Sequence, residues 1–153
     1  MQNREDIAKL HIEELIEVGD SFKIVVKGYS MLPLLGFGHD TITLRRTDSN
    51  ENIDGRIAMF RGEHGRIVVH RVISVVDGVV TLRGDGNLYQ CEKCPRNEII
   101  GVLESVIREN HREVSCTTRW WHFREKLWLS MPVIVRRYAL AIFRRLADLK
   151  RKK

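Results

Sequence analysis

The stretch Arg66–Arg83 reads RIVVHRVISVVDGVVTLR and decides the fold class of this chain. Runs of β-branched residues lie on either side of an Asp-Gly pair, which is typical of a tight turn between antiparallel strands. Because successive side chains point to opposite faces of a strand, His70 shares a face with Val68 and Val72. The stretch therefore predicts a β-hairpin in which a histidine interrupts an otherwise apolar face.

Further runs of strand type lie on both sides of this hairpin. They read FKIVV (22–26), TITL (41–44), RIAMF (56–60) and IIGVLESVI (99–107). All are short and bounded by turn residues, such as the GEHG that precedes the hairpin. The segment TDSNENIDG (47–55) is expected to form a polar loop that contributes nothing to the core. We therefore expect a mainly β domain of coiled antiparallel strands over residues 21–116.

Helical periodicity is confined to the two ends of the chain. Asp6–Val18 places apolar residues on one side and acidic residues on the other, which predicts a short amphipathic helix within residues 1–20. A second set of apolar residues recurs at helical spacing near the other end: Leu127, Met131, Ile134, Tyr138, Ile142, Leu146 and Leu149. This set predicts a basic amphipathic helical tail within residues 117–153, with Ser130 as the N-cap of its helix.

The charge of the chain is concentrated in that tail. The net charge is +6, yet residues 119–153 hold eleven basic and two acidic side chains, so the rest of the chain is mildly acidic. This asymmetry indicates an anionic partner. Trp120, Trp121 and Trp128 beside a cationic helix favour the headgroup layer of a membrane, whereas nothing typical of nucleic-acid recognition accompanies the charge. Docking of the helix on the body of the protein is the alternative.

Length and targeting signals narrow the class of protein further. A chain of 153 residues corresponds to one core-forming domain. The first 20 residues lack the apolar run of a secretory signal, and the longest uncharged run, 127–135, falls short of the roughly 20 residues that span a bilayer. We expect a cytoplasmic protein that associates with a membrane only peripherally.

The three cysteines do not make a disulfide framework, which favours a reducing compartment. Cys91 and Cys94 form a C-x-x-C motif on a predicted loop, and two free thiols are the preferred interpretation. A zinc site completed by His111 and Cys116, or a redox pair, are the alternatives. No metal or other cofactor is expected.

Three polar elements carry candidate chemistry. Ser30 follows a strand in KGYSMLP (27–33), where Gly28 lets the backbone turn and Pro33 stiffens the exit. His70 titrates near neutral pH and can act as a general base. Asp85 lies between two glycines in RGDGN (83–87), where it is either a turn residue or the acid that orients an imidazole. Each element alone is more typical of a structural role.

Taken in order along the chain, these elements resemble a known superfamily. The motifs S-M-x-P, I-A-M-F, V-H-R-V-I, R-G-D-G-N and I-I-G-V, within roughly residues 22–107, are similar to those of the type I signal peptidases and LexA repressors, which are serine peptidases. A histidine followed by Arg-Val resembles the endoplasmic-reticulum and archaeal branch, whose catalytic dyad is Ser-His. The resemblance implies antiparallel β-sheets of the LexA and signal-peptidase type.

The same resemblance implies residue roles. It makes Ser30 the nucleophile and His70 the general base, with Asp85 as the third catalytic residue. Glu92 in that third role, or no acid at all, are the open alternatives. The neighbours of the nucleophile that would contact substrate are Gly28, Met31 and Pro33.

The activity that follows is that of a serine endopeptidase that needs no cofactor. Its substrate would be an extended peptide or a leader segment, and the basic tail would bring it to a membrane surface. A self-cleaving regulator of the LexA kind, or an inactive binding module of the same fold, are the alternatives.

Overall fold

The computed structural model describes residues 21–36 and 40–152. The predicted N-terminal helix therefore lies outside the described residues. The strands are β1 (Ser21–Val25), β2 (Thr41–Arg45), β3 (Ile57–Arg61), β4 (Ile67–Val76), β5 (Val79–Arg83), β6 (Glu92–Pro95), β7 (Ile99–Ile107) and β8 (Glu113–Ser115). The helices are α2 (Arg119–Ser130) and α3 (Val133–Arg151), and short 3-10 turns occupy Glu63–Gly65 and Arg96–Glu98.

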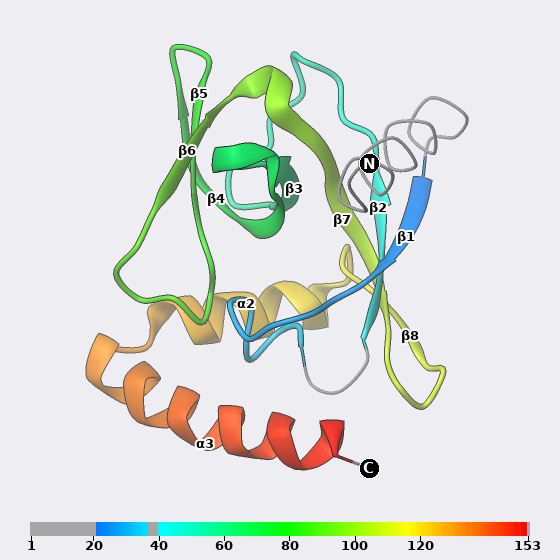
Figure 1. Ribbon diagram of the computed structural model, residues 1–153, viewed down its shortest axis with the longest axis vertical. Coiled ribbons are helices and arrows are strands. Elements are labelled where there is room, and N and C mark those ends of the chain that lie inside the picture. The colour runs from blue at the N-terminus through cyan, green and yellow to red at the C-terminus, as the bar shows by residue number, and fades with distance from the viewer. Residues whose placement is uncertain (1–20, 37–39, 153) are drawn as a thin grey trace, which may run out of the picture.

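All strand pairs of the described chain are antiparallel, and they form one curled sheet. The strand order is β1-β2-β7-β3-β4-β5-β6, with β8 added to β7. Strand β7 pairs with β2 on one side and with β3 on the other. It therefore joins the β1-β2 pair to the strands β3 to β6 in a single sheet. Figure 1 shows the sheet curling around its own interior, with both helices gathered at one end. The prediction of a mainly β fold is confirmed.

The two predicted turns are also confirmed. Asp77 and Gly78 connect β4 to β5 with φ values of 49° and 76°, the left-handed conformation that this kind of two-residue turn requires. The GEHG segment connects β3 to β4. The short strands β6 and β8 were not predicted, because EKCP and EVS carry little strand signal.

The core is built on both faces of the curled sheet. One cluster includes Phe22, Ile42, Leu44 and Met59, and the other includes Phe60 and Val72. Ile53 also belongs to the second cluster and is only 1% exposed. The expectation that the loop 47–55 contributes nothing to the core was therefore wrong: its single large apolar residue is buried while the polar residues around it face outward.

The C-terminal tail forms two helices rather than one. Thr118 caps α2 by accepting a hydrogen bond from the Trp121 amide. Ser130 is not the predicted N-cap of the second helix: it is the last residue of α2, and its hydroxyl donates to the Leu127 carbonyl. Pro132 occupies the N-cap position of α3. Proline fits there because it has no N–H to satisfy and its φ is fixed near the helical value.

Both helices pack against the loops at one end of the sheet. Leu140 and Ala147 of α3 are buried with Leu32 and Trp128 in a third cluster. The tail is therefore docked on the body through one side of α3. No helix in the described part of the chain combines the length and apolar character needed to cross a bilayer.

Candidate active site

Ser30 is presented on the loop that connects β1 to β2. Its side chain is exposed, whereas the next residues are deeply buried: Met31 is 2% exposed and Leu32 is fully buried. Within the loop, the Leu32 amide donates to the Tyr29 carbonyl and the Leu35 amide donates to the Met31 carbonyl. The buried apolar residues and these backbone hydrogen bonds hold the loop against the core, so the position of the exposed Ser30 is fixed by its neighbours.

The turn that follows β5 holds this loop from the other side. The Gly86 amide donates to the Ser30 carbonyl over 2.8 Å. A Cβ added at Gly84 would lie 2.3 Å from the Ser30 carbonyl oxygen and 3.2 Å from Nε2 of His70. Gly84 is therefore packed closely against both the backbone of Ser30 and the imidazole. The backbone of the sequence-predicted nucleophile and the imidazole of the predicted base, 40 positions apart in the chain, therefore both lie close to this one glycine.

His70 lies in β4 and is almost completely buried, at 5% exposure. Its neighbour across the sheet is Ala58, and the ring of Phe60 lies 6.0 Å away between centroids. Burial lowers the pKa of His70 and outweighs the opposing effect of the Glu92 and Asp85 charges. The imidazole is therefore neutral at neutral pH, the form that can accept a proton.

Glu92 is the carboxylate that faces this imidazole. Its Oε1 lies 3.5 Å from Nδ1 of His70. Nδ1 is buried and makes no hydrogen bond to a described residue. Glu92 therefore faces Nδ1 of the ring at a distance somewhat longer than a hydrogen bond.

Asp85 has a different partner. Its two carboxylate oxygens accept hydrogen bonds from Nε and Nη2 of Arg71 over 2.8 and 2.7 Å. Arg71 also donates to Glu125 of α2 and to the Gly55 carbonyl, and the Trp128 indole donates to the Asp85 carbonyl. Both Arg71 and Asp85 are almost fully buried. Asp85 therefore ties α2 to the sheet beneath the site.

The sequence matches no protein-family model and no curated protein.

A cleft of about 640 Å³ opens beside Ser30. One wall consists of Ser30, Tyr29 and the turn 86–89, and the other consists of α3 residues: Arg137, Leu140, Ala141 and Arg144. The two walls touch, because the Tyr29 hydroxyl donates to Asp148 and Arg144 donates to the Gly86 carbonyl. The contribution of α3 to this cleft was not predicted, because helical periodicity alone does not show which face docks.

The predicted substrate-contacting neighbours of Ser30 are dispersed. Gly28 is exposed with a φ of 92°, which favours glycine. Met31 points into the main core cluster. Pro33 lines a different pocket of about 510 Å³ with Asp40, Arg108, Arg124 and Lys150.

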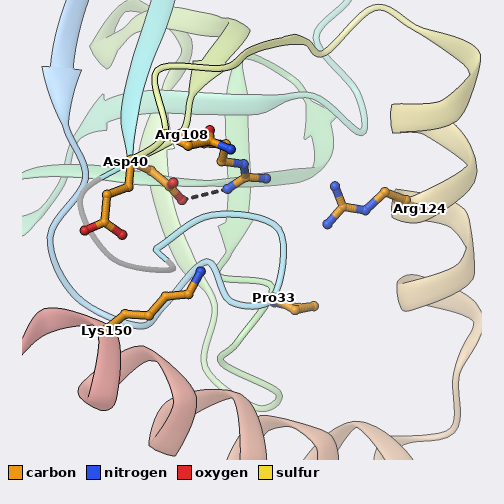
Figure 2. A pocket seen from close by; sticks show the side chains of 7 residues that line it. Pro33, Asp40, Arg108, Arg124 and Lys150 are labelled. Atoms are coloured by element: carbon orange, nitrogen blue, oxygen red, sulfur yellow. Dashed lines mark hydrogen bonds and ion pairs between the residues drawn. The ribbon is translucent and has the colours of Figure 1, made fainter. Parts of the chain in front are cut away.

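Figure 2 shows this second pocket, in which Arg108 pairs with the buried Asp40 over 2.7 Å. Arg108 also donates to the Leu34 carbonyl. Neither Ser30 nor His70 lines the pocket. Its ion pair joins the end of β7 to the loop after Ser30.

The cysteines do not converge on a site. Cys91 is exposed, whereas Cys94 and Cys116 are buried, and all three thiols are free. Burial raises the pKa of Cys94 to about 11 and that of Cys116 to about 12, so neither provides a thiolate at neutral pH. Among the described residues, no group of three or more His, Cys, Asp and Glu side chains is placed to hold a metal ion.

The close packing of Gly84 leads to a testable prediction. Gly84→Ala places a methyl group against the Ser30 carbonyl, and that backbone must move. We expect a loss of about 1–3 kcal/mol of stability, typical of overpacking, together with displacement of Ser30 from His70. Thermal unfolding and a crystal structure of the variant measure both effects. In Gly78→Ala the added methyl group meets open space, so only the strain of its positive φ is expected. Equal stability of Gly84→Ala and the wild type would contradict the packing argument.

Proposed function

We propose that this protein is a serine endopeptidase of the signal-peptidase and LexA type, in which Ser30 is the nucleophile and His70 the general base. The observation that carries the proposal is the contact at Gly84, whose added Cβ would meet both the Ser30 carbonyl and Nε2 of His70. Glu92, facing Nδ1, takes the role of the orienting acid in preference to Asp85. The curled antiparallel sheet agrees with this fold type.

The proposed chemistry is acyl transfer to a serine. Nε2 of His70 takes the proton of the Ser30 hydroxyl as the oxygen attacks the scissile carbonyl, and the oxyanion accepts a hydrogen bond from the Ser30 amide. The imidazolium then gives its proton to the leaving amine. Water, deprotonated by the same imidazole, hydrolyses the acyl-enzyme and restores Ser30. The charge of Glu92 favours the transient imidazolium.

An extended peptide fits the approach to Ser30. Strand β1 ends the strand order of the described sheet and runs directly into the Ser30 loop. A peptide that added a strand at this edge would form backbone hydrogen bonds and extend towards the hydroxyl. The alternating exposure of β1, in which Phe22 is buried and Lys23 exposed, is that of a strand with one covered face.

Cleavage of a random peptide mixture, read by mass spectrometry, tests the proposal. The Ser30→Ala/His70→Ala double variant sets the background. Products that form with the wild type and not with the double variant support the proposal, whereas equal products, or none with either protein, contradict it. A gel time course of the purified wild type separates this activity from self-cleavage, because only a self-cleaving chain shortens on its own.

The pH dependence of kcat/KM is predicted from the burial of His70. The base must be neutral, so activity falls as the pH drops through the pKa of His70. Because burial lowers that pKa, we expect the midpoint below the usual imidazole value of about 6.5. Glu92 opposes the shift by raising the pKa, so Glu92→Gln should move the midpoint to still lower pH.

Initial rates across the acid range measure this effect. Glu113→Gln removes the same charge from β8, where Glu113 binds Ser105 rather than the imidazole, and is expected to leave the midpoint in place. A midpoint that rises in Glu92→Gln would show that this carboxylate does not act on His70.

A further inference from the structure

The outer side of α3 carries a continuous stripe of large apolar side chains. Its members recur every three or four residues, and their exposed fractions are 69% for Ile134, 70% for Tyr138, 60% for Ile142, 47% for Leu146 and 64% for Leu149. The opposite side of the helix is buried through Leu140 and Ala147. In Figure 1 α3 is the outermost element at its end of the molecule. A contiguous exposed apolar patch of this kind marks an interaction surface.

The charges beside this outer stripe are almost all positive. Exposed cations of α3 and its C-terminal end are Arg137, Arg144, Arg145, Lys150 and Lys152. The helix holds a single acidic residue, Asp148, which accepts the hydrogen bond of the Tyr29 hydroxyl. Long basic side chains can bury their aliphatic stems beside apolar residues while their charges reach outward. The surface is therefore apolar along its centre and cationic at its edges.

We propose that the outer stripe of α3 docks this protein on an anionic lipid surface, with the helix lying in the plane of the headgroups. An amphipathic helix with basic flanks inserts its apolar side into the boundary between headgroups and acyl chains, and its cations meet lipid phosphates. A second copy of the chain is a less favourable partner for the outer stripe than a lipid surface. A symmetric contact between two copies would bring the same cations of α3 face to face.

This placement brings the lipid surface close to the cleft. Arg137, Ala141 and Arg144 line the cleft beside Ser30, and Arg137 and Ala141 follow Ile134 and Tyr138 by one helical turn. The cleft wall and the outer stripe are therefore adjacent sides of one helix. A peptide held at the membrane surface would meet Ser30 at the edge of the docked face. The docking itself does not depend on the proposed peptidase activity, because vesicle binding is measured without any substrate.

Sedimentation with vesicles tests the proposal. We expect the full-length wild type to bind vesicles of equimolar phosphatidylcholine and phosphatidylglycerol, and to bind phosphatidylcholine vesicles at least about 10-fold more weakly, because several cations face the surface. Ile134→Glu/Ile142→Glu should weaken binding to the anionic vesicles by at least about 100-fold, since two apolar anchors are lost and two negative charges are added. Circular dichroism verifies that this variant is folded, as expected for exposed positions.

The matched control is Ile73→Glu/Val76→Glu. These residues are 43% and 61% exposed on β4, so the same charge is added to an exposed apolar site away from α3. This control should bind as the wild type does. The proposal is overturned if the wild type does not bind anionic vesicles, if it binds both kinds of vesicle equally, or if the two double variants bind the anionic vesicles with the same affinity. It is also overturned if light scattering shows a wild-type dimer that Ile134→Glu/Ile142→Glu converts to a monomer, because the stripe would then join two copies.

Discussion

Replacing either Ser30 or His70 with Ala is expected to lower the rate of peptide cleavage by about 10⁴-fold or more. Ser30→Ala removes the attacking oxygen, and His70→Ala leaves a hydroxyl that is a poor nucleophile at neutral pH. Because the two groups act in one step, the double variant should be little slower than either single variant. Initial rates on the peptides that the wild type cleaves give this comparison directly.

Two controls separate this prediction from general damage. Ser49→Ala and His122→Ala remove the same residue types from exposed positions outside the cleft and should keep wild-type rates. Ser30→Ala should also keep the wild-type melting temperature, because its side chain is exposed. A folded Ser30→Ala variant that still cleaves would exclude Ser30 as the nucleophile, and independent losses that multiply in the double variant would exclude a joint role for Ser30 and His70.

The proximity of Ser30 and His70 follows from features that the sequence displays only in part. The hairpin containing His70 is specified locally by β-branched runs and an Asp-Gly turn, so it was predictable. The partner of that hairpin is not local: β3 pairs with β4 on one side and with β7 on the other. Only this non-local pairing brings the turn after β5 onto the Ser30 loop. The motif order indicated such an arrangement through resemblance rather than through periodicity.

The sequence left open whether Asp85 or Glu92 faces His70, and it did so for a physical reason. Alternation along β4 places Arg71 on the face opposite His70, and Arg71 takes both oxygens of Asp85. The sequence RGDGN does not indicate whether the Asp85 carboxylate will contact His70 or its neighbour Arg71 in β4. Glu92 lies on the unpredicted strand β6, two strands away from His70 in the sheet. Its approach to Nδ1 depends on the curl of the sheet, which a linear pattern does not encode.

The orientation of the C-terminal helix α3 was likewise not predictable from the sequence. The apolar residues at helical spacing were predicted as one amphipathic face, and most of them form the exposed stripe of α3. The face that docks on the body consists instead of Leu140, Ala147 and the partly buried Phe143. A helix with apolar residues on two sides cannot be oriented from its periodicity alone, because either side satisfies the pattern.

The second large effect is expected from Asp85→Asn, and it is an effect on stability. The substitution removes the charge that Arg71 meets in a site where both side chains are almost fully buried. Breaking a buried ion pair in this way costs about 3–5 kcal/mol, which corresponds to a fall in melting temperature of about 10 °C or more for a domain of this size. Glu125 and the Gly55 carbonyl still accept from Arg71, so the protein should fold at low temperature.

Cleavage by Asp85→Asn at low temperature then decides between its two roles. If Asp85 acts through Arg71, the folded variant should retain most of its rate, and its pH midpoint should move less than that of Glu92→Gln, because the Glu92 charge has the larger effect on the pKa of His70. Arg71→Met/Asp85→Leu/Glu125→Leu is the matched variant: because Arg71 pairs with both carboxylates, replacing all three charged side chains with apolar ones should recover much of the lost stability. A variant Asp85→Asn with an unchanged melting temperature and a 10⁴-fold slower rate would instead make Asp85 the acid that orients His70, and Glu92 would lose that role.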